Sequence, residues 1–259
     1  MSYLVNPYDD PYVRILFYGT AGATKTRTVS TAAWDERTAP ALMLETGGNP
    51  ISIRDYEKIP TIVKLETVGD LNAPYDWFHR GQPANHPFAK KFGLELGYKS
   101  IIIDSLTDLQ RLVIDETTNR TDVAPGDPVA ALGLQGFGQI LARVLHMTRL
   151  YFGLPVHVFI TCLESEHAGV LKPLLWGQAR DEVPGYGYVV GRLAHRDDLP
   201  PKIKVVLKGE LESAKSAYIA LFSKQSQYYA KDQYGVLGHY LVDPTIGKIM
   251  DLIQPNGGA

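Results

Sequence analysis

Continuous apolar runs alternate with helical repeats along most of this chain. Four such runs predict buried strands, at residues 13–18, 41–44, 98–104 and 156–162. Runs of this kind are typical of strands that are covered on both faces, as in a parallel sheet. Apolar residues at helical spacing predict helices at 25–34, 106–118 and 134–152. The alternation of strand and helix predicts an α/β fold with a doubly wound, mostly parallel sheet and helices on both faces.

Composition predicts the segments between these elements. Residues 72–97 are rich in proline, glycine, histidine and asparagine, which indicates a surface insertion. Loops are expected at 119–131 and 163–201, and further strands at 202–208 and 217–230. The length suits one large α/β domain, or a domain with a small appendage, and we expect a single domain over residues 1–259.

Residues 19–26 read Gly-Thr-Ala-Gly-Ala-Thr-Lys-Thr and follow a predicted strand directly before a predicted helix. This is the setting of a Walker A loop, G-x-x-x-x-G-K-[ST], whose backbone N–H groups bind phosphate oxygens. Lys25 would contact the β- and γ-phosphates of ATP, and the Thr26 hydroxyl would ligate Mg²⁺. The predicted ATP-binding residues are Gly19, Thr20, Ala21, Gly22, Ala23, Thr24, Lys25, Thr26 and Arg27.

One position of the loop departs from the template. Thr24 stands where the second glycine is expected, and its Cβ would crowd a phosphate that approaches the backbone. Gly22, two residues earlier, supplies part of the lost flexibility. The alternative is a glycine- and threonine-rich turn that carries a lysine–threonine pair by chance.

Two carboxylates follow predicted strands. Asp104 ends the run Ile-Ile-Ile-Asp, which is the Walker B arrangement, and it would hold Mg²⁺ together with Thr26. Its alternative role is to cap the following helix, for which Ser105 is also a candidate. Glu45 ends the strand at 41–44 and would orient or deprotonate the attacking water, unless it is only a solvated strand end.

These features together resemble the RecA/RadA-type recombination ATPases, especially the short phage-encoded versions linked to single-strand annealing. The matching stretches span most of the chain and lie at residues 17–26, 44–48, 101–106, 158–164 and 230–235. The resemblance implies a RecA-like P-loop core that uses ATP and Mg²⁺. It also implies self-association into a ring or filament, with ATP bound between neighbouring subunits.

The resemblance assigns roles to further residues. Glu45 would be the catalytic glutamate, and Thr161 or Glu164 would be the polar sensor of the γ-phosphate. Lys231, in Lys-Asp-Gln-Tyr-Gly, would contact the ATP of the neighbouring subunit, although a solvated turn lysine is the alternative. Gln233 stands where the family signature has arginine, so hydrolysis is expected to be slow or to depend on DNA.

Charge and composition limit the possible partners. The chain has 26 basic and 28 acidic residues, so any nucleic-acid contact must come from a local patch. The single cysteine, Cys162, cannot form an internal disulfide and is predicted to be buried. No apolar stretch is long enough to span a membrane, and residues 1–10 lack a signal-peptide pattern. We therefore expect a cytoplasmic location, in the host cytoplasm if the chain is phage-encoded.

Two segments are candidates for a single-stranded DNA contact by position, 119–136 and 165–201. The first contains one basic residue, Arg120, beside two aspartates. The second mixes basic and aromatic residues, which neutralise phosphates and stack on bases, but acidic residues dilute it. Its basic and aromatic members are Lys172, Trp176, Arg180, Tyr186, Tyr188, Arg192, His195, Arg196 and, just beyond it, Lys202. A plain surface loop, or a core strand at 188–193, is the alternative.

The sequence thus predicts an ATPase that assembles on single-stranded DNA and promotes annealing or strand exchange, with single-strand-binding or other recombination proteins as further partners. A helicase-type motor is one alternative. A nucleotide-binding scaffold with weakened hydrolysis, marked by Thr24 and Gln233, is the other.

Overall fold

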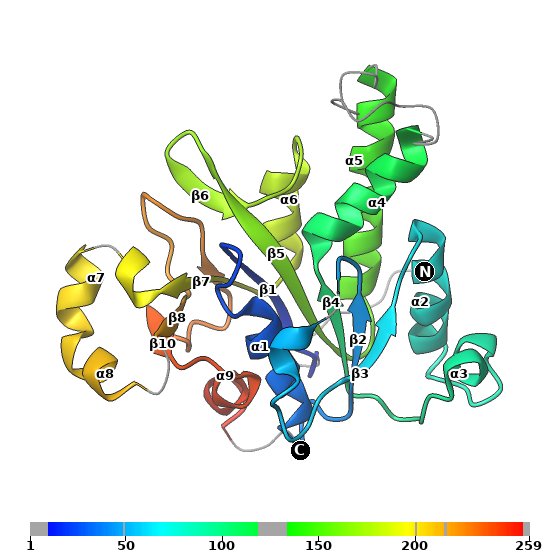
Figure 1. Cartoon of the computed structure of the whole chain (residues 1–259), viewed down its shortest axis with the longest axis horizontal. Coiled ribbons are helices and arrows are strands. Elements are labelled where there is room, and N and C mark those ends of the chain that lie inside the picture. The colour runs from blue at the N-terminus through cyan, green and yellow to red at the C-terminus, as the bar shows by residue number, and fades with distance from the viewer. Residues whose placement is uncertain (1–9, 49, 119–133, 200, 215–216, 256–259) are drawn as a thin grey trace.

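The strands of this protein lie in one twisted mixed sheet (Figure 1), which a computed structural model describes for residues 10–48, 50–118, 134–199, 201–214 and 217–255. The order is β10-β8-β7-β1-β5-β4-β2-β3, while β6 pairs with β5 and β9 with β7. The run from β7 to β3 is parallel, and β6, β8, β9 and β10 pair antiparallel with their neighbours. The strands are β1 Arg14–Gly19, β2 Ala41–Glu45, β3 Thr61–Lys64, β4 Ser100–Asp104, β5 His157–His167, β6 Val170–Pro173, β7 Val189–His195, β8 Tyr218–Leu221, β9 Lys231–Asp232 and β10 Tyr240–Val242.

Helices cover both faces of the sheet because its central strands are apolar on both sides. In β1, Leu16 and Tyr18 pack into the core beneath α2, α4, α5 and α6, whereas Ile15 and Phe17 pack into the core beneath α1 and α9. The predicted doubly wound, mostly parallel α/β fold is therefore confirmed. The helices are α1 Lys25–Ser30, α2 Asn72–His79, α3 Pro87–Phe92, α4 Leu106–Thr118, α5 Leu134–Phe152, α6 Ala179–Tyr186, α7 Pro201–Val206, α8 Lys208–Ser213 and α9 Ile246–Ile253.

The segment 72–97 differs from the surface insertion that its composition indicates. It forms α2 and α3, and the aromatic side chains of Trp77, Phe78 and Phe88 are buried in the main core. The chain between the helices is also anchored, because the Gln82 side chain exchanges two hydrogen bonds of 2.7 Å with the backbone of Tyr98. These aromatic residues therefore make the segment part of the packed fold.

Other expectations need correction toward the carboxyl end. Residues 163–201 are not a loop: they hold the end of β5, then β6, α6 and β7. The strand expected at 202–208 is wrong, since α7 occupies most of it, and the strand expected at 217–230 is only β8. The helix expected at 25–34 consists of α1 followed by a 3₁₀ turn, Thr31–Ala33. The loop expected at 119–131 lies outside the described residues.

Candidate nucleotide-binding site

The glycine loop connects the carboxyl end of β1 to the first turn of α1. Gly19 is required there by close packing, because a Cβ at this position would lie 2.3 Å from the carbonyl oxygen of Leu193 in β7. Gly22 adopts a left-handed backbone, φ +81°, which favours glycine. The two glycines therefore allow the chain to turn from β1 directly into α1.

Thr24 occupies the position where the template has its second glycine. It adopts a left-handed conformation, φ 58° and ψ 18°, directly before α1, and its carbonyl accepts the first helical hydrogen bond from Thr28 at 2.8 Å. A residue with a Cβ disfavours this conformation by about 1–2 kcal/mol. The loop thus has the shape that glycine permits, and threonine reaches it at a cost in stability.

Lys25 is held against the loop itself. Its side chain is buried, and Nζ donates hydrogen bonds to the carbonyl oxygens of Gly19 at 2.9 Å and Thr20 at 2.7 Å. Burial lowers the pKa of Lys25, and the negative charge of Asp104 opposes that shift. The ammonium group is therefore at the glycine loop, in a setting where an additional anion would favour its charged form.

Asp104 joins three elements at the carboxyl edge of the sheet. Its Oδ2 accepts a hydrogen bond of 2.7 Å from the hydroxyl of Thr26 in α1, and its Oδ1 accepts one from the hydroxyl of Thr161 in β5. Parallel strands make this possible, since β5 lies between β1 and β4 and all three end at the same edge. The hydroxyl oxygen of Ser105 accepts a hydrogen bond from the backbone N–H of Asp108 in the first turn of α4, so the capping role predicted for Ser105 is confirmed. The two predicted metal ligands, Thr26 and Asp104, are thus brought together.

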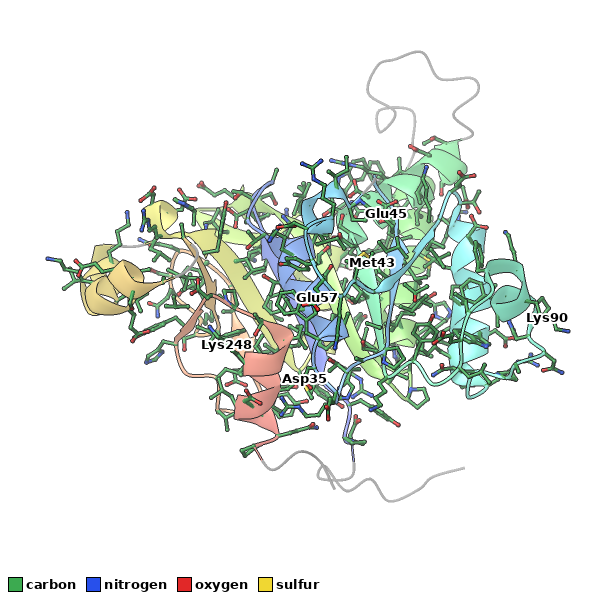
Figure 2. The ribbon with its side chains drawn as sticks, turned by 60° about the horizontal axis from the view of Figure 1, so that its bottom comes forward. Asp35, Met43, Glu45, Glu57, Lys90 and Lys248 are labelled. Atoms are coloured by element: carbon green, nitrogen blue, oxygen red, sulfur yellow. The ribbon has the colours of Figure 1, made fainter. Side chains whose placement is uncertain are left out.

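Glu45 lies at the same edge, one strand further along (Figure 2). It is opposite Asp104 in the pairing of β2 with β4, and its side chain is buried. Its Oε1 accepts hydrogen bonds from the backbone N–H groups of Gly47, at 2.8 Å, and Gly48. The alternative of a solvated strand end is therefore wrong, and Glu45 is a carboxylate fixed beside Asp104.

Glu164 and Thr161 have different partners, although both lie on β5. Thr161 binds Asp104, whereas Glu164 forms a buried ion pair with Arg192 of β7, with N–O distances of 2.9 and 3.2 Å. The Arg192 guanidinium also lies over the ring of Tyr228, 5.8 Å from its centre. Of the two sensor candidates, Thr161 is therefore the one that contacts the predicted metal ligand.

Arg192 follows the alternative of a core strand at 188–193 and not the candidate DNA-binding loop. It is 4% exposed in β7, opposite Tyr18 of β1. The available signal was the run Val-Val-Gly-Arg-Leu-Ala around it, which reads as a buried strand with one charge. A buried arginine needs a partner, which here is Glu164 of β5.

Two predicted site residues are not brought to the loop. Arg27 turns outward, pairs with Asp55 at 2.8 Å and lies 4.5 Å over the ring of Tyr56. Lys231 donates to the carbonyl oxygens of Gly187, at 2.8 Å, and Gly185. It lies opposite Val190, near the start of β7, whereas the glycine loop is at the other end of the neighbouring strand β1. Neither side chain contacts the phosphate loop of its own chain.

The candidate DNA segment 165–201 does not form one basic surface. Lys172 pairs with Asp181 at 2.7 Å, and Arg192 is buried against Glu164. Trp176 packs near Phe137, with ring centres 6.1 Å apart. The other candidate, 119–136, lies almost wholly outside the described residues. The basic and aromatic residues of this segment are therefore divided among a hairpin, a helix and a buried strand.

These contacts define a class of protein: an α/β fold with a glycine loop, a buried lysine and two carboxylates at the carboxyl ends of its parallel strands. No protein-family model matches the chain, and no curated protein matches its sequence. One similar solved structure comes from the "structural and biochemical analysis of a prototypical ATPase from the type III secretion system of pathogenic bacteria", with a TM-score of 0.40 and 12% identity. The match covers 80% of this chain and 54% of that one, so the chain spans about half the length of that ATPase.

A likeness at this level carries no information on activity, so the case for nucleotide binding depends on the site residues themselves. Among the described residues, no helix is both long and apolar enough to cross a membrane.

Proposed function

We propose that this chain binds Mg²⁺·ATP and hydrolyses it, as a RecA-like P-loop ATPase. The observation that carries the proposal is the hydrogen bond of 2.7 Å between the Thr26 hydroxyl and the Asp104 carboxylate, next to Lys25. A Walker A threonine and a Walker B aspartate, which are 78 positions apart in sequence, meet at the end of a phosphate-type loop. A turn that carries a lysine–threonine pair by chance would not be expected to form this contact between Thr26 and Asp104.

The residues fit the groups that such an enzyme binds. Backbone N–H groups at the start of α1 suit phosphate oxygens, and Lys25 would exchange its bonds to the Gly19 and Thr20 carbonyls for phosphate contacts. Thr26 and Asp104 offer a hydroxyl and a carboxylate oxygen, which are the hard ligands that Mg²⁺ prefers. The bound metal would neutralise charge on the β- and γ-phosphates.

Glu45 supplies the remaining chemistry of hydrolysis. Its Oε1 is occupied by the Gly47 and Gly48 N–H groups, which leaves the second carboxylate oxygen to orient a water molecule or to accept its proton. The Thr161 hydroxyl, bound to Asp104, connects β5 to the same site. Glu164 is paired with Arg192, so it takes no direct part in this proposal.

We also propose assembly on single-stranded DNA, for annealing or strand exchange. The support is the resemblance to recombination ATPases together with the place of Lys231. Since Lys231 contacts Gly185 and Gly187 of its own chain, a contact with ATP would have to involve the loop of a neighbouring subunit. Measuring the oligomeric state with an ATP analogue and single-stranded DNA tests this part: a persistent monomer would contradict it.

ATP turnover tests the proposal as a whole. The wild-type chain should hydrolyse ATP, single-stranded DNA should raise the rate, and Lys25→Ala should abolish it. Lys90→Ala, which removes the same charge from the exposed surface of α3, is the matched control and should leave turnover unchanged. Nucleotide binding without turnover in the wild type would favour the scaffold instead. Turnover without dependence on Lys25 would contradict the assigned site.

A further inference from the structure

A second positively charged site lies outside the residues that would hold ATP. A cavity of about 310 Å³ is enclosed by β6, the first turn of α6 and the segment 224–229. Three cationic side chains line it, Lys172, Arg180 and Lys224, against the single carboxylate of Asp181. Two positive charges therefore remain uncompensated in the lining, which is the charge pattern of a site for an anion.

Arg180 is the unusual member of this lining. Its Nε is buried and has no hydrogen-bond partner within the part of the chain that the structure describes. A buried N–H donor without an acceptor costs free energy, so such groups are usually satisfied by a partner that the protein or its ligand supplies. Lys224 likewise has no ion pair or hydrogen bond to any described residue, whereas Lys172 pairs with Asp181 at 2.7 Å.

The walls of the cavity are held in place by contacts that do not involve Arg180 or Lys224. Leu171 of β6 accepts from and donates to the segment 224–229, through Tyr229 N–H at 3.0 Å and the Gln227 carbonyl at 2.8 Å. Tyr18, next to the glycine loop, donates its hydroxyl proton to the Leu171 and Tyr229 carbonyl oxygens. The Lys172–Asp181 pair joins β6 to α6. The cationic groups are therefore presented by an ordered frame that is anchored to β1.

We propose that this cavity binds a phosphate group. The guanidinium of Arg180 can bind two oxygens of a phosphate, and Lys224 adds a flexible point charge. A phosphate with two ionisable oxygens carries about 1.5 to 2 negative charges at neutral pH and a phosphodiester of DNA carries one, so the uncompensated charge of the lining attracts either. The volume is at the small end of the range of about 300–1,000 Å³ for ligand pockets, which leaves ample room for one phosphate.

This phosphate could come from two sources, inorganic phosphate or the backbone of single-stranded DNA. Both can be tested in the Lys25→Ala chain, in which the glycine loop no longer contributes its ammonium group. The result is then independent of whether the ATP proposal is right. Binding of inorganic phosphate is measured by titration calorimetry, and binding of a labelled oligothymidylate of about 15 nucleotides by fluorescence anisotropy.

Arg180→Lys keeps the charge and removes the guanidinium, and Lys224→Ala removes an exposed charge. Each should weaken at least one of the two probes by about tenfold. Lys90→Ala, on the exposed surface of α3, should leave both affinities within about twofold, and thermal melts should show that every variant folds. Weaker binding of inorganic phosphate by Arg180→Lys or Lys224→Ala identifies a small-anion pocket. Weaker binding of the oligonucleotide alone identifies a contact with the DNA backbone. If neither probe binds, or if Arg180→Lys and Lys224→Ala bind as well as Lys90→Ala does, the proposal is overturned.

Discussion

Thr24 combines a β-branched side chain with the left-handed backbone, φ 58°, that the turn into α1 requires. Threonine is poorly suited to this region because its Cβ carries two heavy atoms close to the backbone. The template glycine avoids that cost, but it also loses more entropy on folding. The two effects oppose each other, and the strain is the larger one.

Thr24→Gly should therefore stabilise the chain by up to about 1.6 kcal/mol, as the net of about 1–2 kcal/mol of strain relieved and about 0.4–1 kcal/mol of added entropy loss. Chemical denaturation measures the change. Thr24→Ala keeps a Cβ in the left-handed region and should gain less. A less stable Thr24→Gly chain would show that the threonine makes contacts that outweigh its backbone strain.

Asp104 is the residue on which the proposed metal site depends, because both of its oxygens bind hydroxyl groups of neighbouring elements. Asp104→Asn keeps the shape and the capacity to hydrogen-bond Thr26 and Thr161, but it removes the negative charge that attracts Mg²⁺.

Asp104→Asn should weaken ATP binding in the presence of Mg²⁺ by about tenfold or more, equivalent to about 1.4 kcal/mol. Without Mg²⁺, in excess chelator, wild type and variant should bind ATP with similar affinities. Calorimetric titration under both conditions provides the comparison. Equal affinities with Mg²⁺ present would mean that Asp104 is only a structural hydrogen-bond acceptor.

At the scale of elements, β5 begins with a buried histidine that secures the entry into β1. The Nδ1 of His157 accepts the Val13 N–H at 3.0 Å, which requires an unprotonated nitrogen at that position. Burial is the main cause that lowers the pKa of His157 to about 4, and the nearby Arg14 adds to it. The unfolded chain, with a histidine pKa of about 6.5, therefore takes up the proton first as the solution is acidified.

The free energy of unfolding should fall as the pH falls from about 6.5 to about 4, and His157 accounts for about 2–3 kcal/mol of this loss. The substitution His157→Asn removes the titrating ring and can place an amide oxygen near the Val13 N–H. The His157→Asn chain should lose about that much less stability than wild type between pH 7 and pH 4.5, as measured by urea denaturation. An identical loss in both chains would show that His157 already binds its proton in the fold.

The ion pair between Glu164 and Arg192 joins β5 to β7 beside the glycine loop. Both side chains are about 5% exposed, so each charge depends on the other. Glu164→Gln leaves the arginine buried without a counter-charge and should destabilise the chain by about 3–5 kcal/mol.

Removing both charges, in Glu164→Gln with Arg192→Met, should cost less than the single change, because no unpaired charge remains. Thermal and urea denaturation of the three chains test the comparison. A double variant that is less stable than the single one would mean that Arg192 has a second essential partner, for which the Tyr228 ring is the candidate.

The sequence predicted strands better than it predicted the region after β5. Strands β1, β2 and β4 are almost entirely buried, so their unbroken apolar runs carried the signal. Residues 202–208 alternate lysine with apolar residues and therefore resemble a strand, but they form α7. Leu207 is buried there and Val205 is 77% exposed. Which of these side chains is buried depends on the packing surface beneath the segment and not on the local sequence pattern.

The same reasoning applies to the site. The glycine loop, Thr26, Asp104 and Glu45 were predicted because each follows a strand, and parallel strands end at one edge. The partners of Glu164 and Arg27 could not be predicted, since they depend on side chains from distant segments. The cavity around Arg180 was equally hidden, because its walls come from three separate stretches of the chain.

At the scale of the whole molecule, the sheet edge built from β1, β4 and β2 should bind one ligand. Calorimetric titration of Mg²⁺·ATP into the wild-type chain and into Lys25→Ala tests most directly the prediction that this edge binds the nucleotide. Lys90→Ala is the control for loss of charge. We predict binding to the wild type and to Lys90→Ala, and a loss of affinity of at least about tenfold in Lys25→Ala. Equal affinity in all three chains, or no binding to the wild type, would contradict the assignment of this edge as a nucleotide site.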